Sequence, residues 1–283
     1  MKIVECPRDA MQGLHDFIPT EVKASYINQL LKVGFDTIDF GSFVSPKAIP
    51  QMRDTAQVIE ELQLENTVSR LLAIVANIRG AEDACQFEEI SYLGFPLSLS
   101  ETFQQRNTNR SIDEALHILN GIQDISLQNN KTLVTYISMG FGNPYSDPYN
   151  QETVITFVER LSNMGVAIIS LADTIGVSQP ETISYLFQNL IPAFPAIEFG
   201  AHLHSHPASA RDKIDAAFKS GCQRFDGAIK GFGGCPMAKD DLVGNMATES
   251  IIDYLTNEKV IIDIDREAFA QAVVEATKVF PLS

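Results

Sequence analysis

The feature that most limits the fold of this 283-residue chain is a regular alternation of short β-rich runs with amphipathic helical stretches. Such alternation is typical of βα units on a parallel sheet, because each strand needs a crossover before the next parallel strand. We predict strands at 2–7, 37–43, 69–75, 89–96, 132–138, 167–172, 197–202 and 224–229. Between them we predict helices, among others at 21–33, 52–64, 112–128, 152–164, 180–189 and 208–219.

Eight such units in a chain of this length favour a closed (β/α)8 TIM barrel over an open doubly wound sheet. No G-x-G-x-x-G follows the first run, and no G-x-x-x-x-G-K-[ST] occurs anywhere, so the nucleotide-binding folds lack their phosphate cradle. No spacer or low-complexity tract divides the sequence. We therefore expect an α/β protein in which residues 1–283 form one TIM-barrel catalytic domain with an extra C-terminal helix.

The charge balance excludes some partners. The chain has 36 acidic and 21 basic residues, a formal charge of -15, which opposes binding to nucleic acid or to an anionic membrane. No apolar run reaches the roughly 18 residues of a membrane span. The first residues lack the apolar stretch of about 7–15 residues that a signal peptide needs, so we expect a cytoplasmic location. A small anionic ligand remains compatible, because a metal or a few cations can dominate the field of one site.

The four cysteines show no metal-binding spacing. Cys6, Cys85, Cys222 and Cys235 contain no C-x-x-C pair, which disfavours a structural zinc site and a disulfide scaffold. The first three are expected to be small buried hydrophobes. Cys235 lies in the glycine-rich segment 231–236, which is either a mobile loop or a close backbone approach to a ligand. Its thiol is therefore either inert or accessible to a substrate.

A His-x-His pair is the best candidate for metal binding. Alternate residues of a strand share a face, so His202 and His204 are placed to share one divalent ion. Asp9, after the first run, and Asn245, beyond the glycine-rich loop, could add oxygen ligands. This mixed set suits Mg²⁺ or Mn²⁺. The alternative is that the histidines only form hydrogen bonds at the top of the barrel and that Asp9 is a cap.

Charged residues near predicted strand ends supply catalytic candidates, because barrel enzymes collect their chemistry there. Arg8 could stabilise a developing oxyanion, or it could form a salt bridge with a neighbouring carboxylate. Asp173 could act as a general base on a hydroxyl, or it could cap the loop that follows. Asp39, which lies in the second predicted strand, is a further candidate carboxylate.

Five ordered blocks resemble the 3-hydroxy-3-methylglutaryl-CoA (HMG-CoA) lyase family of metal-dependent barrel enzymes. The similarity runs from Pro7 to about Leu255, and its most specific block is Ser42-Phe43-Val44-Ser45-Pro46-Lys47 with the residues to Met52. The supporting blocks are Ser100-Glu101-Thr102-Phe103 with Asn107 and Asn109, Leu171-Ala172-Asp173-Thr174-Ile175-Gly176, Gly233-Gly234-Cys235-Pro236, and Gly244-Asn245-Met246-Ala247-Thr248-Glu249.

The resemblance implies a reaction and roles for these residues. In the family's reaction the metal holds the hydroxyl and carboxylate of HMG-CoA, a base removes the hydroxyl proton, and the C2–C3 bond breaks to give acetoacetate and acetyl-CoA. We therefore expect an acyl-CoA substrate and, as one expected assembly, a homodimer. Arg8 would stabilise the enolate, Asp173 would act as acid and base, and Cys235 would take part in proton transfer. The implied metal ligands are Asp9, His202, His204 and Asn245, and the catalytic candidates are Arg8, Asp39, Asp173, His202 and Cys235.

Several residues depart from the family pattern. Asp39 replaces a glutamate, Lys230 replaces a small residue, and Asn143 stands where the family has the cysteine of Gly-Cys-Pro-Tyr. Ser205-His206-Pro207-Ala208 replaces Asp-Thr-Tyr-Gly, and we expect His206 to be a solvated first-turn residue rather than a ligand, because Pro207 should start a helix. Such changes leave two alternatives open, which are a Claisen-type synthase that condenses an acyl-CoA with a 2-oxo acid, and a non-catalytic paralogue.

Overall fold

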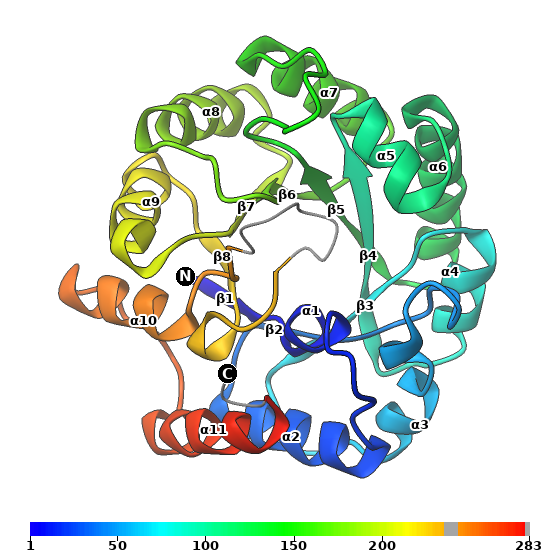
Figure 1. The fold of residues 1–283 in the computed structure, drawn as a ribbon, viewed down its shortest axis with the longest axis vertical. Coiled ribbons are helices and arrows are strands. Elements are labelled where there is room, and N and C mark those ends of the chain that lie inside the picture. The colour runs from blue at the N-terminus through cyan, green and yellow to red at the C-terminus, as the bar shows by residue number, and fades with distance from the viewer. Residues whose placement is uncertain (235–242, 281–283) are drawn as a thin grey trace.

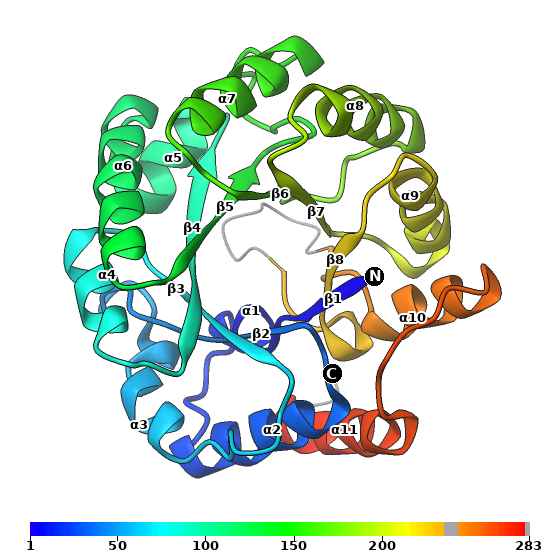
Figure 2. The ribbon, with the colours of Figure 1, turned by 180° about the vertical axis from the view of Figure 1, so that it is seen from behind.

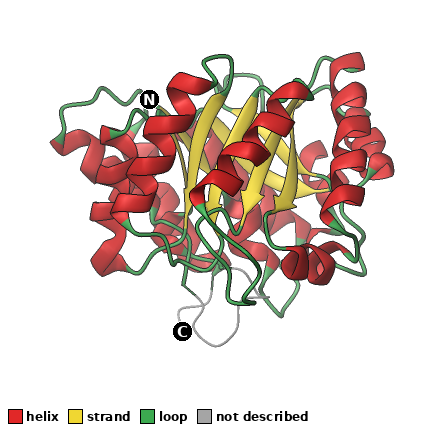
Figure 3. Cartoon of the chain, turned by 90° about the horizontal axis from the view of Figure 1, so that it is seen from above, coloured by secondary structure: helices red, strands yellow, loops and turns green. Residues whose placement is uncertain are grey.

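The strands form a closed parallel barrel in chain order, which confirms the predicted TIM-barrel architecture (Figure 1). The computed structural model describes residues 1–234 and 243–280. Figure 3 shows the strands side by side, with long loops gathered at the end to which the arrows point. The strands are β1 (Lys2–Glu5), β2 (Thr37–Ser42), β3 (Arg70–Ile74), β4 (Ile90–Ser98), β5 (Thr132–Ser138), β6 (Ile168–Asp173), β7 (Glu198–Leu203) and β8 (Arg224–Gly227).

Helices surround this barrel, as the view from behind also shows (Figure 2). None in the described part of the chain is long and apolar enough to cross a bilayer. The α-helices are α1 (Pro7–Gln12), α2 (Thr20–Val33), α3 (Thr55–Glu60), α4 (Ile78–Cys85), α5 (Glu101–Thr108), α6 (Ile112–Gln128), α7 (Gln151–Asn163), α8 (Pro180–Ala193), α9 (Pro207–Lys219), α10 (Thr248–Asn257) and α11 (Arg266–Val279). Two short 3-10 helices are η1 (Pro50–Met52) and η2 (Ile229–Gly231).

The extra C-terminal helix is present as α11, which lies along α2. Gln29 of α2 donates a hydrogen bond to the carbonyl oxygen of Ala268 at 2.9 Å. Phe35, in the turn after α2, packs edge to face on Phe269 of α11 with ring centroids 6.2 Å apart, which adds an aromatic contact beside the two helices.

Several boundaries differ from the predictions, for example at the end of β4 and of α8, and three elements differ in ways that matter for the site or the local chain path. The first strand ends at Glu5, because Pro7 is suited to the first position of a helix and starts α1 there. The last strand stops at Gly227 and gives way to η2, and the helix predicted at 52–64 forms only at Thr55–Glu60. The consequence for the site is that residues 8 and 9 belong to a helical turn and not to a strand end.

Apolar side chains fill the barrel as well as the space between strands and helices. The interior cluster comprises Leu72, Ile74, Tyr92, Val134, Tyr136 and Ile168, which come from alternate positions of β3 to β6. Cys6 and Cys222 are buried as predicted, whereas Cys85 is only half-buried, so the prediction was wrong for this residue. Because this packing closes the barrel interior, ligands can reach only its mouths.

Candidate active site

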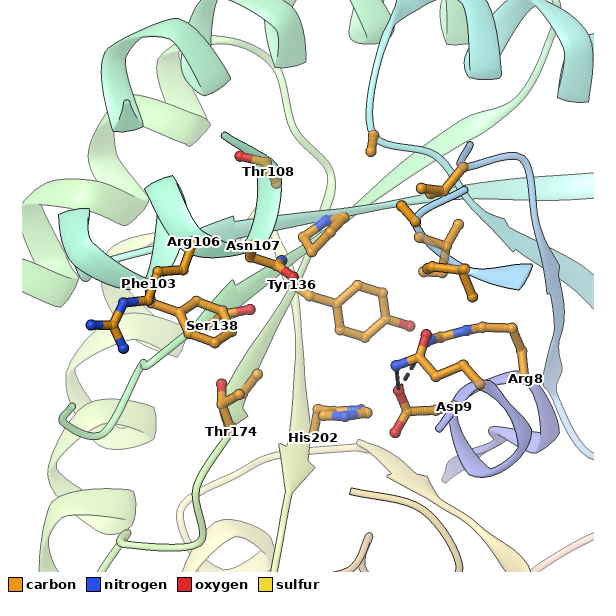
Figure 4. A pocket seen from close by; sticks show the side chains of 18 of the residues that line it. Arg8, Asp9, Phe103, Arg106, Asn107, Thr108, Tyr136, Ser138, Thr174 and His202 are labelled. Carbon is orange, nitrogen blue, oxygen red and sulfur yellow. Dashed lines mark hydrogen bonds and ion pairs between the residues drawn. The ribbon is translucent and has the colours of Figure 1, made fainter. Parts of the chain in front are cut away.

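A cavity of about 440 Å³ opens at the carboxyl ends of the strands. One end is formed by polar residues of α1 and β7, and the other by residues of α5 (Figure 4). The lining includes Arg8, Asp9, Gln12, Tyr136, Thr174, His202 and His204, with Phe103, Arg106, Asn107 and Thr108 at the α5 end. The structure therefore brings Arg8, Asp9, His202 and His204 to one cavity.

Arg8 is fixed by carboxylates on both sides. Its Nε donates to Asp39 Oδ2 at 3.0 Å and its Nη2 donates to the same oxygen, which makes a two-pronged ion pair with β2. Its Nη1 donates to Asp9 Oδ1 and to Gln12 Oε1, both at 2.9 Å. Burial opposes the charge, but Asp39 and Asp9 raise the pKa of Arg8 above its usual value. The guanidinium is therefore a permanent and well-oriented cation at the cavity wall.

The two carboxylates beside Arg8 have different pKa shifts. Burial raises the pKa of Asp39 to about 6, although Arg8 acts in the opposite direction. Burial also opposes ionisation of Asp9, but Arg8 and the two histidines lower the pKa of Asp9 to about 2. Asp9 is therefore an anion at any working pH, as a metal ligand has to be.

Asp9, His202 and His204 form a compact set of donor atoms. Their ligand atoms all lie within 4.8 Å of one another. Burial, together with His202, lowers the pKa of His204 to about 4, so the imidazole is neutral near pH 7, the state that binds metals. His204 Nδ1 is buried and has no hydrogen-bond partner among residues 1–234 and 243–280. A divalent ion fits this set, because it would satisfy that nitrogen.

The backbone brings Asn245 to the same place. Residue 245 forms an antiparallel β-bridge with His204, and Met246 N donates to the carbonyl oxygen of Leu203 at 3.0 Å. The Asn245 amide Nδ2 donates to Asp9 Oδ2 at 2.8 Å and to the carbonyl oxygen of Phe232 at 2.9 Å. Asn245 is therefore hydrogen-bonded to Asp9, another of the predicted metal ligands.

Gly233 explains why the glycine-rich loop lies so close to the site. Its φ of +91° favours glycine, and an added Cβ would lie 2.7 Å from Ala10 Cα and 2.8 Å from Asn245 Nδ2. A close backbone approach, one of the two predicted alternatives, is thus found at residue 233. Cys235 lies outside the described residues.

Asp226 is a site residue that the sequence analysis missed. Its carboxylate Oδ2 lies 3.2 Å from His202 Nδ1 and accepts a hydrogen bond from Ser170 Oγ at 3.3 Å. Burial opposes protonation of His202, but Asp226 raises its pKa above the ordinary value. A carboxylate on one ring nitrogen fixes the orientation of the imidazole and leaves the other nitrogen available to bind a metal. The only sequence signal for Asp226 was the alternation of charged and apolar residues at Arg224, Phe225 and Asp226 in β8.

Asp173 lies beside the cavity and not on its lining. Its carboxylate accepts hydrogen bonds from the backbone N–H of Val177 at 2.8 Å and from the N–H and hydroxyl of Ser178. It also pairs with Lys213 Nζ at 2.8 Å, and that amine donates to the His204 carbonyl oxygen at 2.9 Å. These contacts connect Asp173 to the strand that carries the histidines.

His206 is the N-cap residue of α9, which begins at Pro207 as predicted. It is exposed and is absent from the described cavity lining. Its position agrees with the prediction of a solvated residue. The row of alternate histidines therefore contributes two members to the site, His202 and His204.

Comparisons with known proteins agree with this geometry. The HMGL-like family profile matches residues 2–274. The chain is 35% identical over 266 residues to the hydroxymethylglutaryl-CoA lyase YngG of Bacillus subtilis, covering 94% of this chain and 88% of that protein. It is 34% identical over 260 residues to the cytoplasmic HMG-CoA lyase of Rattus norvegicus, covering 91% and 74%.

Solved structures agree as well. The HMG-CoA lyase structure of B. subtilis superimposes with a TM-score of 0.91 at 34% identity, covering 98% of this chain and 92% of that one. An HMG-CoA lyase of Acinetobacter baumannii in complex with coenzyme A and 3-methylmalate gives a TM-score of 0.91 at 28% identity, covering 98% and 90%. The chain therefore belongs to the HMGL-like family.

Proposed function

We propose that this chain is a divalent-metal-dependent lyase that cleaves HMG-CoA, or a close 3-hydroxyacyl-CoA, to acetyl-CoA and acetoacetate or the analogous oxo acid. One observation carries the proposal: Asp9, His202 and His204 converge beside the fixed cation Arg8 at one end of the cavity. The relatives named above are lyases, so condensation of an acyl-CoA with a 2-oxo acid is not favoured.

Asp9, His202, His204 and Asn245 would hold the metal. The donor set of one carboxylate, two imidazoles and one amide oxygen suits Mg²⁺ or Mn²⁺. When bound, the ion supplies Lewis-acid chemistry, which lowers the pKa of the substrate hydroxyl. Asp226 keeps His202 in the orientation that this requires.

Arg8 would stabilise the enolate of the departing acyl-CoA. When the C2–C3 bond breaks, its electron pair moves toward the thioester oxygen, which then carries negative charge. A guanidinium already held by Asp39 and Asp9 meets this charge without reorganisation. Asp39 therefore acts as the positioning partner of a catalytic arginine.

The general-base role of Asp173 stays a prediction. Its oxygens accept hydrogen bonds from Val177, Ser178 and Lys213, and these contacts support a positioning role toward the His204 strand end. Cys235 is the proposed partner in proton transfer at C2, on the family resemblance alone.

The loop with the Asn143 departure supports the far end of the cavity. Asn143 accepts hydrogen bonds from the backbone N–H of Tyr145 and Asp147 at 3.0 and 3.1 Å. Asp147 in turn accepts from Thr102 N at 2.9 Å, which secures the start of α5. This helix carries Arg106, which lines the cavity. We propose that the CoA portion of the substrate enters at this end of the cavity.

The test is a panel of 3-hydroxyacyl-CoA thioesters, each with Mg²⁺ or Mn²⁺ and with a chelator. We expect acetyl-CoA release from HMG-CoA or from one close homologue, dependent on the metal. Free CoA that appears only with an added 2-oxo acid would instead identify a synthase. Metal binding with no release from any thioester would identify a non-catalytic paralogue.

A further inference from the structure

Tyr136 lies in the cavity beside the residues proposed to hold the metal and the enolate. It lies on β5, projects into the barrel interior and lines the cavity with Arg8 and His202. Its ring packs edge to face on the His202 imidazole, with centroids 5.5 Å apart and an interplanar angle of 79°. Figure 4 shows its hydroxyl directed toward the side of the cavity that Arg8 lines.

The phenol oxygen of Tyr136 is buried without a partner. The residue is 6% exposed, and the oxygen has no hydrogen-bond partner among residues 1–234 and 243–280. Two other half-buried or buried tyrosines have hydroxyl partners: the Tyr92 hydroxyl accepts from Arg70 Nη1 at 2.6 Å, and the Tyr149 hydroxyl donates to the Gly140 carbonyl at 2.9 Å. An unpaired buried hydroxyl destabilises the ligand-free protein, so its presence in the site needs another explanation.

The hydroxyl of Tyr136 keeps its proton. A phenol has an ordinary pKa of about 10, well above neutral pH. The group is therefore a hydrogen-bond donor at any working pH. Arg8 also has donor capacity left, because the hydrogen bonds to Asp39, Asp9 and Gln12 among the described residues occupy all but one of its N–H groups.

We propose that Tyr136 is a catalytic residue whose hydroxyl donates a hydrogen bond to the thioester oxygen of the bound acyl-CoA. The inference rests on the proposed lyase function. In the cleavage step the C3 hydroxyl proton passes to the base, the C3–O bond becomes a carbonyl, and the C2–C3 pair moves to the enolate of the acyl-CoA. Tyr136 and Arg8 together bind the enolate oxygen, and Tyr136 retains its proton throughout.

The role is tested with Tyr136→Phe against Tyr92→Phe, a matched change in the same barrel interior. Loss of one oxyanion donor should lower kcat by about 10²–10³-fold in Tyr136→Phe. The KM should rise by no more than about threefold, because the hydrogen bond to the neutral thioester oxygen gains most of its strength in the transition state. The Mn²⁺ dissociation constant should stay within the same range, because Tyr136 is not a proposed metal ligand. Exchange of the C2 hydrogens of acetyl-CoA in D₂O should fall with kcat.

A structural role predicts a different outcome. Tyr136→Phe removes an unpaired buried hydroxyl, so its ligand-free Tm should equal or exceed that of the wild type, whereas Tyr92→Phe should have a lower Tm and keep its kcat. An unchanged kcat in Tyr136→Phe, or a loss of kcat that follows a lowered Tm, would overturn the inference.

A spectroscopic readout separates this inference from the proposed function. The carbonyl stretch of bound [1-¹³C]acetyl-CoA should move to higher frequency in Tyr136→Phe than in the wild type, because a donor is lost. If the wild type cleaves no thioester but shows this difference, the lyase function and the catalytic role of Tyr136 fail, whereas the hydrogen bond from Tyr136 to the thioester oxygen stands. An identical carbonyl stretching frequency in the wild type and in Tyr136→Phe, or no binding of acetyl-CoA, overturns the inference.

Discussion

Asn245 donates a hydrogen bond from its side-chain amide to the Asp9 carboxylate at 2.8 Å, although 236 positions separate the two residues. The second hydrogen of the same amide goes to the Phe232 carbonyl oxygen. Both donors are therefore used, which leaves Oδ1 as the atom of Asn245 that can bind a metal. The contact joins the two ends of the sequence in one site.

Replacement of Asn245 should weaken metal binding without unfolding the protein. Asn245→Ala removes one oxygen ligand and the donor that orients Asp9, so we expect the Mn²⁺ dissociation constant to rise by about 10–100-fold. Asn257→Ala, an exposed change on α10, should leave it unchanged. Titration with Mn²⁺, followed by electron paramagnetic resonance, measures the dissociation constants of both variants. A dissociation constant of Asn245→Ala equal to that of the wild type would exclude Asn245 as a ligand.

The Arg8–Asp39 pair should tolerate a change of length but not a loss of charge. Asp39→Ala leaves a buried guanidinium without its main partner, so we expect a loss of about 3–5 kcal/mol in the free energy of unfolding. Misplacement of Arg8 should also lower kcat by about 10²-fold. Asp39→Glu restores the family's carboxylate and should retain most of the stability and most of the kcat of the wild type. Urea unfolding measures the stability of the two variants, and steady-state kinetics measures their kcat. Equal stability and equal kcat in Asp39→Ala and Asp39→Glu would contradict the positioning role.

Lys213 should be coupled energetically to Asp173. Lys213→Met leaves the buried Asp173 carboxylate without its cationic partner, and we expect a loss of about 3–5 kcal/mol in the free energy of unfolding. Lys219→Met removes an exposed pair with Asp215 on the same helix and should cost less than about 1 kcal/mol. The double variant Asp173→Asn with Lys213→Met should lose less than the sum of the single changes. Additive losses would show that the ion pair is not a unit.

Glu5 should make stability fall as pH rises. Its carboxyl is fully buried, and burial raises its pKa from 4.5 to about 8 in the folded protein. Between these values the folded state holds a proton that the unfolded state has lost, so the free energy of unfolding decreases with pH by about 1.4 kcal/mol per pH unit.

The control for this effect is Glu5→Gln, which keeps an oxygen acceptor for Ile229 N and lacks the titrating proton. Its free energy of unfolding, subtracted from that of the wild type across pH 5–8, isolates Glu5 from other groups. Glu65→Gln, an exposed change, should keep the wild-type slope. The same slope in Glu5→Gln as in the wild type would refute the assignment.

The barrel could be predicted from the sequence because the spacing of apolar runs is a local property. Boundaries failed where one residue changes the local geometry: Pro7 turns Arg8 and Asp9 into helix residues, and the chain after Gly227 turns into η2. Arg8, Asp9, His202 and His204 were found because residues near the ends of barrel strands meet at one mouth.

The supporting residues could not be found in this way. Asp226, Tyr136 and Lys213 lie in buried strands or on an amphipathic helix, where a single polar residue looks like an exposed position in the sequence. Their significance depends on which strands are neighbours and on which face of the barrel each side chain lies. That information arises only when β5, β7, β8 and α9 are packed together.

The central claim is tested most directly by acetyl-CoA release from HMG-CoA with the protein stripped of metal and then reloaded. We predict no release after chelation, and release of acetyl-CoA and acetoacetate in equal amounts after addition of Mg²⁺ or Mn²⁺. His204→Ala, with its fold verified by circular dichroism, should remain inactive after reloading. Cleavage that continues in the chelated protein, or that is unaffected by His204→Ala, would contradict the account.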